Sequence, residues 1–265
     1  MLKTTLLPLS LKESRQRLAD MAGFITYFKT EKVYLCHIIT GNDKKQKALR
    51  ALQEIGNLFE NEGIKAEPVI RKGNIAEQVC MLANDLNVDY LSLKWQKKNI
   101  IKRTILGSPD SDILRICDVP VLIYKSSPYL EAGSQLKTVM YATDFQETDR
   151  KVMPYLSTAL EGVETLYILH VRDRAPDPET DAQRLEQIEL KLKRIADQCV
   201  DNYTSIEPLI TTGSVRYQLP RRALSNQVDL IVIGKHDKKR TMEKIIGSTA
   251  ESLPYRSYNP ILIIS

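Results

Sequence analysis

A glycine-containing segment near the end of the chain has the residue types and spacing of a phosphate-binding loop. Gly234 follows a short apolar stretch, residues 229–233, and Gly247 and Ser248 come after an intervening segment, residues 235–246. Glycine lets backbone amides approach a ligand closely, and a hydroxyl residue that opens a helix can bind phosphate. We therefore predict phosphate binding here, although Ser248 taken alone also fits a helix N-cap.

Charged and titratable side chains within the same segment bear on this chemistry. His236 is the histidine to which we assign ligand contact, whereas His37 and His170 stand at matching strand ends and are interpreted as core or edge residues. No metal site is expected. Asp237 carries a negative charge close to the predicted phosphates. The cationic residues around it can still favour an anion. They are Lys235, Lys238, Lys239 and Arg240.

The elements that must position this segment alternate between strand and helix patterns. Strands are predicted at residues 138–142, 165–171, 206–210, 229–233 and 260–264. Helices are predicted at residues 149–161, 178–202, 216–226 and 248–257. Such alternation indicates a parallel sheet covered by helices on both faces. Ligands of such sheets bind beyond the carboxyl ends of the strands, near the point where the strand order reverses.

The chain contains two copies of one unit. A shift of 140 positions aligns residues 73–123 with residues 213–263 without a gap, and 12 of the 51 pairs are identical, against about 3 expected by chance. Residues 126–128 and 133–134 have linker composition. We therefore predict one domain over residues 1–132 and another over residues 133–265, with a small insertion at residues 172–181.

Composition excludes several classes of protein. The chain has 265 residues, 43% of them hydrophobic and 27% charged, with a formal net charge of +5. This is typical of a folded protein and less basic than a dedicated nucleic-acid binder. No apolar stretch is long enough to cross a membrane and no export signal is visible, so we predict a cytoplasmic protein. The four cysteines form no C-x-x-C pair, and we interpret all of them as reduced.

The spacing of Gly234, Gly247 and Ser248, with Asp144 after the first strand of the second copy, resembles the universal stress protein family. Nucleotide-binding members of that family carry G-x-x-G, nine residues, then Gly and Ser or Thr. The resemblance implies an α/β fold of two tandem, open, parallel five-stranded sheets with helices on both faces, which is Rossmann-like. It also implies that the two copies pair through their last strands, at residues 120–124 and 260–264, as a covalent pseudo-dimer.

The same resemblance implies an adenine nucleotide, ATP or AMP, with magnesium, in the second copy. The base and ribose are expected near Asp144 and Val171, and the phosphates at the loop and the following helix, although Asp144 equally fits a capping residue of the helix that begins just after it. The predicted binding residues are Thr143, Asp144, Val171, Gly234, His236, Asp237, Gly247, Ser248 and Thr249. Asp237 departs from the family pattern, because it stands where the second glycine should be.

The first copy departs further from that pattern. Lys94 and Lys97 replace its first two glycines, and Ser10 replaces the acidic residue after its first strand. Trp95, the single tryptophan, lies between the two lysines, where its ring could fill the space of a nucleotide. We interpret this copy as a degenerate domain that serves as a structural partner or binds another ligand.

Three hypotheses about function follow. The first is a non-enzymatic stress-response or signalling module that binds an adenine nucleotide in the second copy and acts on an unidentified protein partner. The second is a protein-interaction scaffold that has lost nucleotide binding. The third is a slow nucleotide hydrolase that uses His236. No catalytic residues, membrane association or specific nucleic-acid binding are expected, and homodimerisation is left open.

Overall fold

The computed structural model describes residues 1–39, 45–95, 109–125, 136–160, 162–235 and 248–265. Strands and helices alternate through each half of the chain. The first half contains β1 (Thr4–Pro8), α1 (Arg15–Thr26), β2 (Lys32–Ile39), α2 (Lys45–Glu60), β3 (Lys65–Lys72), α3 (Ile75–Asp85), β4 (Tyr90–Lys94), α4 (Pro109–Ile116) and β5 (Val121–Tyr124).

The second half repeats this order after residue 135. It contains β6 (Thr138–Thr143), α5 (Thr148–Pro154), the π-helical turn η2 (Tyr155–Ala159), β7 (Thr165–Arg172), α6 (Pro178–Asp197), β8 (Ser205–Thr212), α7 (Val215–Ser225), β9 (Leu230–Gly234), α8 (Ser248–Arg256) and β10 (Ile261–Ile264). The predicted domain boundary near residue 132 lies outside the described residues.

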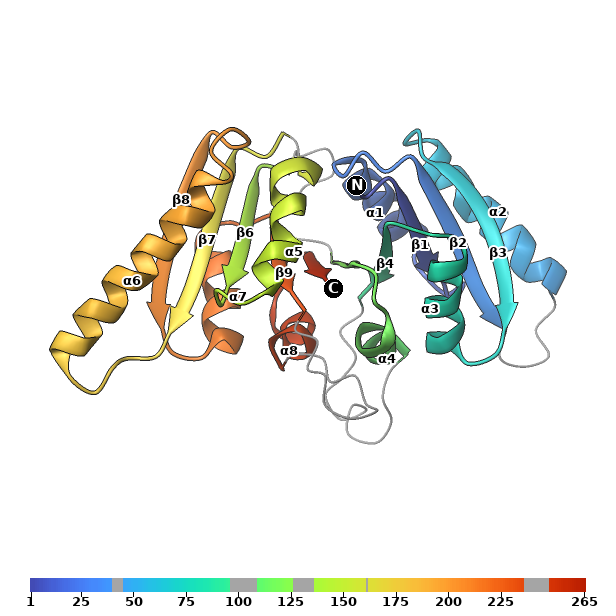
Figure 1. Ribbon diagram of the computed structural model, residues 1–265. Coiled ribbons are helices and arrows are strands. Elements are labelled where there is room, and N and C mark those ends of the chain that lie inside the picture. Colours follow the sequence, from blue (N-terminus) through green and yellow to red (C-terminus); the bar gives the residue numbers. More distant parts are fainter. Residues whose placement is uncertain (40–44, 96–108, 126–135, 161, 236–247) are drawn as a thin grey trace.

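All of these strands form one sheet in the order β3-β2-β1-β4-β5-β10-β9-β6-β7-β8. Pairing within each half is parallel, and the halves join where β10 runs antiparallel to β5, with Leu262 opposite Leu122. Figure 1 shows the two halves meeting at these strands. The predicted α/β class and the pairing through the last strands are confirmed, with the two five-stranded sheets continuous as one.

Helices cover both faces of this sheet. Apolar residues of α1, α2, α5 and α6 pack against one face, as Leu18 and Leu192 do, and those of α3, α4, α7 and α8 pack against the other, as Val79 and Leu253 do. Each of the two cores contains residues of both halves. The halves therefore share their hydrophobic cores. No helix among the described residues is long and apolar enough to cross a membrane.

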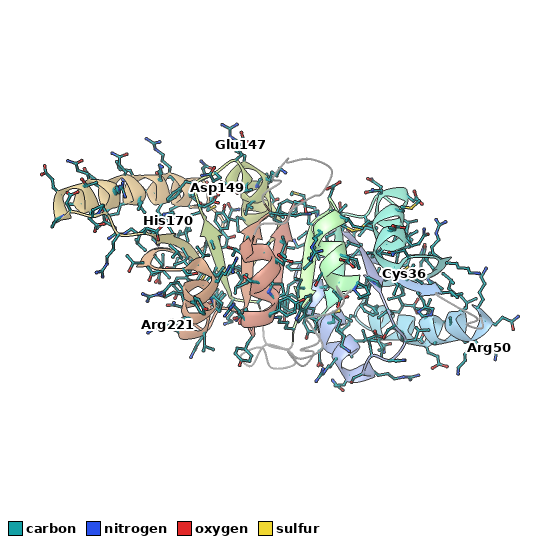
Figure 2. All side chains as sticks on the ribbon, turned by 90° about the horizontal axis from the view of Figure 1, so that it is seen from below. Cys36, Arg50, Glu147, Asp149, His170 and Arg221 are labelled. Carbon is teal, nitrogen blue, oxygen red and sulfur yellow. A yellow bond between two sulfur atoms is a disulfide. The ribbon has the colours of Figure 1, made fainter. Side chains whose placement is uncertain are left out.

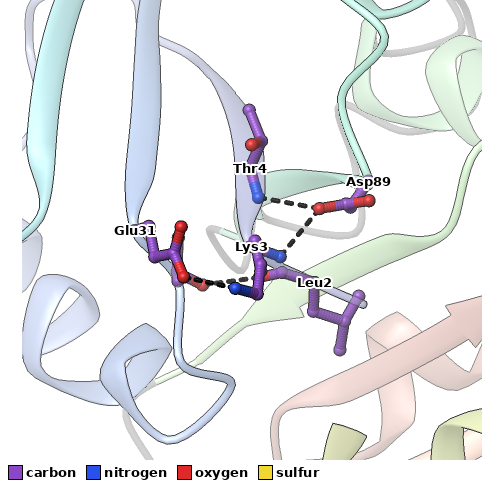
Figure 3. A network of polar contacts seen from close by, with 6 residues as sticks. Leu2, Lys3, Thr4, Glu31 and Asp89 are labelled. Carbon is purple, nitrogen blue, oxygen red and sulfur yellow. Dashed lines mark hydrogen bonds and ion pairs between the residues drawn. The ribbon is translucent and has the colours of Figure 1, made fainter.

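An aspartate that is buried before β9 recurs, exposed, before β4 of the first half and explains one of the repeated sequence positions. The Asp89 carboxylate accepts hydrogen bonds from the backbone N–H groups of Lys3 and Thr4, at 2.8 and 2.9 Å (Figure 3). Asp229 accepts the matching bonds from Lys137 and Thr138, both at 2.9 Å. Burial raises the pKa of Asp229 above its usual value, and the two N–H bonds oppose that shift. These aspartates anchor the first strand of each half and have a structural role.

Two lysines cross the junction in a pseudo-symmetric way. The Lys235 ammonium donates to the carbonyl of Cys117 at 2.8 Å, just after α4 of the first half. The Lys125 ammonium donates to the carbonyls of Pro254 and Ser257, at the end of α8 in the second half. A helix C-terminus presents unpaired carbonyls and a negative partial charge, so each ammonium is well placed there.

Two predicted helices end earlier than their sequence patterns indicate. The helix predicted at residues 149–161 is α-helical only through Pro154, because proline has no N–H to continue the hydrogen-bond ladder, and the chain proceeds as η2. The side chains of Ser157 and Thr158 donate to carbonyls of the preceding turn. The helix predicted at residues 178–202 begins with an Asp177 cap and ends at Asp197.

The cysteine prediction is wrong for one pair. Cys80 on α3 and Cys117 after α4 form a disulfide, with their Cα atoms 5.2 Å apart. Because α3 and α4 pack on the same face of the sheet, two cysteines separated by 37 residues become neighbours. No sequence spacing signals this pair. Cys36 and Cys199 are free and buried, as predicted.

Candidate functional site

Four of the predicted binding residues lie at one edge of the sheet. Thr143 ends β6 and Asp144 follows it, Val171 lies near the end of β7, and Gly234 ends β9. Because β6 pairs in parallel with both β7 and β9, the carboxyl ends of these strands meet. The strand order reverses between β6 and β9, since β7 and β8 continue on one side and β10 on the other. This is the switch point at which ligands of such sheets bind.

The loop that would complete the site is only partly described. Ser248 and Thr249 are the first two residues of α8, and Thr249 is half-buried. His236, Asp237 and Gly247 lie outside the described residues, so their predicted contacts remain predictions. The N-terminus of α8 carries a positive partial charge, which favours a phosphate.

A hydrogen-bond network fixes the end of β6 to the first turn of α5. The Asp149 carboxylate accepts from the Tyr141 hydroxyl at 2.5 Å and from the Thr143 hydroxyl at 2.7 Å. The Thr143 oxygen also accepts from the backbone N–H of Phe145 at 2.9 Å. Burial, and next the charge of Asp149, raise the pKa of Tyr141. The Thr143 hydroxyl therefore forms hydrogen bonds within the protein.

His170 lies beside this network, and Figure 2 labels it with Asp149 on the same half. Its Nδ1 bonds to the backbone carbonyl of Thr143 at 3.0 Å, so that nitrogen carries the proton, and its ring stacks on Phe145 at 4.3 Å. His37 makes the matching bond to the carbonyl of Leu9 at 2.8 Å. The interpretation of both histidines as strand-edge residues is confirmed.

Gly234 has a structural requirement that the sequence did not reveal. A Cβ atom added to it would lie 2.6 Å from the Cβ of Thr148, in the first turn of α5. The φ angle of Gly234 is not positive, so backbone conformation does not require glycine here. Close packing of β9 against α5 therefore explains this glycine without any ligand.

Two further residues make contacts that involve no ligand. The Asp144 carboxylate accepts from the backbone N–H of Gln146 at 3.1 Å, which forms a turn ahead of α5, and the side chain is exposed. Lys235 was expected to supply positive charge around Asp237. Its ammonium donates to carbonyls at the end of α4 in the first half, because a buried cation requires acceptors and these carbonyls supply them.

The corresponding edge of the first half has different chemistry. Ser10 donates its hydroxyl to Glu13 at 2.7 Å, and Lys94 ends β4 where Gly234 ends β9. Trp95 packs its ring edge-on against Tyr255 of α8, with ring centroids 4.8 Å apart. The tryptophan therefore lies in the junction between the halves.

A cavity of about 840 Å³ borders α5 and α6 and is lined by Phe145 and Asp149, among others. None of the predicted binding residues that the structure describes lines it. Sequence reasoning missed Asp149 and Thr148, which hold β6 and β9 in place. Neither carries a sequence signal, because their partners lie in other elements and are unrelated to helical or strand periodicity.

The fold defines a class of protein: a pseudo-symmetric α/β chain of two halves, each with a parallel five-stranded part of the sheet and a point where the strand order reverses. The model of the universal stress protein family matches residues 1–125 and again residues 135–265. The chain belongs to the universal stress protein family.

Relatives of known sequence and structure agree with this assignment. A universal stress protein of Methanocaldococcus jannaschii is 23% identical over 153 residues, which are 48% of this chain and 94% of the relative. The crystal structure of a universal stress protein from Archaeoglobus fulgidus has a TM-score of 0.76 and 21% identity, covering 100% of this chain and 97% of that one. A putative universal stress protein from Pseudomonas aeruginosa has a TM-score of 0.69 and 17% identity, and the match covers 99% of this chain and 92% of that one. These solved structures are similar in fold to the whole chain.

Proposed function

We propose that this universal stress protein is a cytoplasmic signalling module that binds an adenine nucleotide, ATP or AMP, in its second half. The observation that carries the proposal is the convergence of Thr143, Asp144, Val171 and Gly234 at the switch point, where residues 236–247 connect β9 to α8. The half-buried Val171 offers an apolar surface to a base, and the exposed Asp144 offers a carboxylate to ribose hydroxyls.

The phosphates would lie at the other side of this edge. Backbone amides at Gly247, Ser248 and Thr249 would face them, at the positive end of α8. Asp237 in place of a glycine opposes a triphosphate, and a magnesium ion held with ATP would lessen that repulsion. A bound nucleotide would contact the loop of residues 236–247 and change the surface that this loop offers to a protein partner.

A paired substitution tests this proposal. Gly247→Val puts a branched side chain where amides must face phosphate, and Gly107→Val makes the same change at the matching position of the first half. We expect calorimetric titration with ATP or AMP to lose its signal in Gly247→Val and to keep it in Gly107→Val. The reverse pattern would place the site in the first half.

The second candidate function is a protein-interaction scaffold that binds no nucleotide, and the contacts of three residues favour it. Thr143, Gly234 and Lys235 each have structural partners that account for them without a ligand. A scaffold predicts no heat on titration of the wild-type chain with either nucleotide. The same wild-type titration therefore separates the two functions.

We also propose that the chain has no catalytic turnover. The described edge holds two carboxylates, Asp149 bonded to two hydroxyls and Asp144 bonded to a backbone N–H, and one histidine, His170, bonded to a backbone carbonyl. None of them is arranged as a general base next to a nucleophile. Phosphate release from ATP well above background that is lost in His236→Ala would replace this proposal with a hydrolase.

A further inference from the structure

A small cavity lies at the junction of the two halves, where β4 and β5 end. Its volume is about 190 Å³, and its walls come from both halves, with Trp95 and Tyr124 from the first and Tyr258 from the second. None of the predicted nucleotide residues that the structure describes lines it. Cavities of roughly 150 Å³ hold a benzene ring. The space fits a small organic molecule and is too small for a whole nucleotide.

Trp95 is a largely buried residue of the cavity wall. The side chain is only 9% exposed, and its backbone N–H bonds to the carbonyl of Tyr124 at 3.1 Å. The indole Nε1 is buried and has no hydrogen-bond partner among the described residues. Because Nε1 has almost no accessible surface, the part of Trp95 that a ligand in the cavity would contact is its aromatic ring.

Three cationic residues line the same cavity, and one of them, Lys125, donates its ammonium to two backbone carbonyls at the end of α8. Arg17, on the first turn of α1, is exposed, and Lys94, at the end of β4, is half-buried. Neither forms an ion pair within the described part of the chain. Burial lowers the pKa of Lys94, an effect that Glu13 opposes and Arg17 adds to. A bound anion would offset the cost of holding this ammonium away from water.

We propose that the cavity binds a small oxyanion with a planar apolar body, of the size and chemistry of an aromatic carboxylate. The Arg17 guanidinium and the Lys94 ammonium can only donate hydrogen bonds, so they select an acceptor such as a carboxylate. The rings of Trp95, Tyr124 and Tyr258 supply apolar walls for the body of the ligand. The ligand would contact both halves at once. The site is separate from the proposed nucleotide edge of the second half.

Trp95 makes the binding directly measurable. It is the only tryptophan in the chain, so tryptophan fluorescence of the full-length protein reports on this cavity. The probes are benzoate, acetate and inorganic phosphate. We expect benzoate to change the fluorescence saturably, and acetate and phosphate to bind at least tenfold more weakly, because neither has a ring to fill the cavity. Binding of phosphate tighter than that of benzoate would contradict the proposal.

Charge-removing variants complete the test. Arg17→Gln and Lys94→Gln should each weaken benzoate binding about tenfold. Arg50→Gln removes the same charge from an exposed position on α2, at the end of the first half away from the junction in Figure 2, and should leave benzoate binding unchanged. The proposal is overturned if benzoate gives no saturable change, if all three variants bind alike, or if AMP displaces benzoate from the cavity.

Discussion

Glycine at position 234 shows that a residue which fits a ligand-binding pattern can be required by packing alone. Its α hydrogen faces Thr148 of α5 so closely that any Cβ would collide with that side chain. In the first half, Lys94 stands at the matching position. The glycine is therefore explained by the approach of α5 to β9, and its presence alone does not demonstrate a phosphate site.

This explanation predicts a stability effect that is independent of any nucleotide. Gly234→Ala should lower the free energy of unfolding by about 1–3 kcal/mol, as overpacking of a core typically does. Gly23→Ala is the control, because its added Cβ would have no neighbour closer than 4.0 Å and alanine is favoured within a helix such as α1. Urea unfolding measures the free energy of unfolding of both variants. Equal stability of Gly234→Ala and the wild type would contradict the packing account.

Helices α4 and α8 connect the two halves through side-chain contacts at the junction. Each ends near the junction, and each receives a lysine ammonium from the opposite half. Arg115 and Glu251 link the same two helices with an exposed ion pair at 3.1 Å. An exposed pair contributes little to stability, whereas Lys235 is 3% exposed and satisfies buried carbonyls.

Lys235→Met should therefore destabilise the chain by about 1–3 kcal/mol, because it keeps the length of the side chain but leaves the α4 carbonyls without their donor. Lys193→Met, on the exposed side of α6, removes the same charge and should change stability by less than about 0.5 kcal/mol. Chemical denaturation of the two variants provides the comparison. Unfolding of both at the same urea concentration would show that the crossing lysine is dispensable.

The sequence predicts the positions of strands and helices better than it predicts the contacts between their side chains. Strand and helix periodicity located every element of the second half, with errors mainly at the ends of α5 and α6. The partners of Lys235 and Cys80 were not predictable, because they lie 118 and 37 residues away and no local pattern encodes such pairs. The identity of Asp89 with Asp229 was visible, but its role in anchoring β1 and β6 required the structure.

At the scale of the whole molecule, two copies of one unit share a sheet and two hydrophobic cores. The antiparallel pairing of β5 with β10 closes an edge that each half would otherwise expose. The carboxyl-edge chemistry differs between the halves, with Gly234 and Asp144 in one and Lys94 and Ser10 in the other. The duplication thus supports one proposed nucleotide site and one degenerate counterpart.

We propose the division into domains 1–132 and 133–265, and separate expression of the two pieces tests it. Each should show the circular dichroism of an α/β fold, because each contains a complete set of strands and helices. Each should also be less stable than the full chain and should self-associate through its uncovered β5 or β10 edge, as sedimentation would show. Random-coil spectra from both pieces would contradict two domains.

The number of nucleotides bound per chain tests the central claim most directly. Calorimetric titration of the full-length protein with ATP, and separately with AMP, gives this number together with the affinity. The account predicts one site per chain for the nucleotide that binds, since only the second half combines Asp144 and Gly234 with Gly247 and Ser248. Two sites would show that the first half is competent despite Lys94 and Ser10, and no binding of either nucleotide would leave the chain a scaffold.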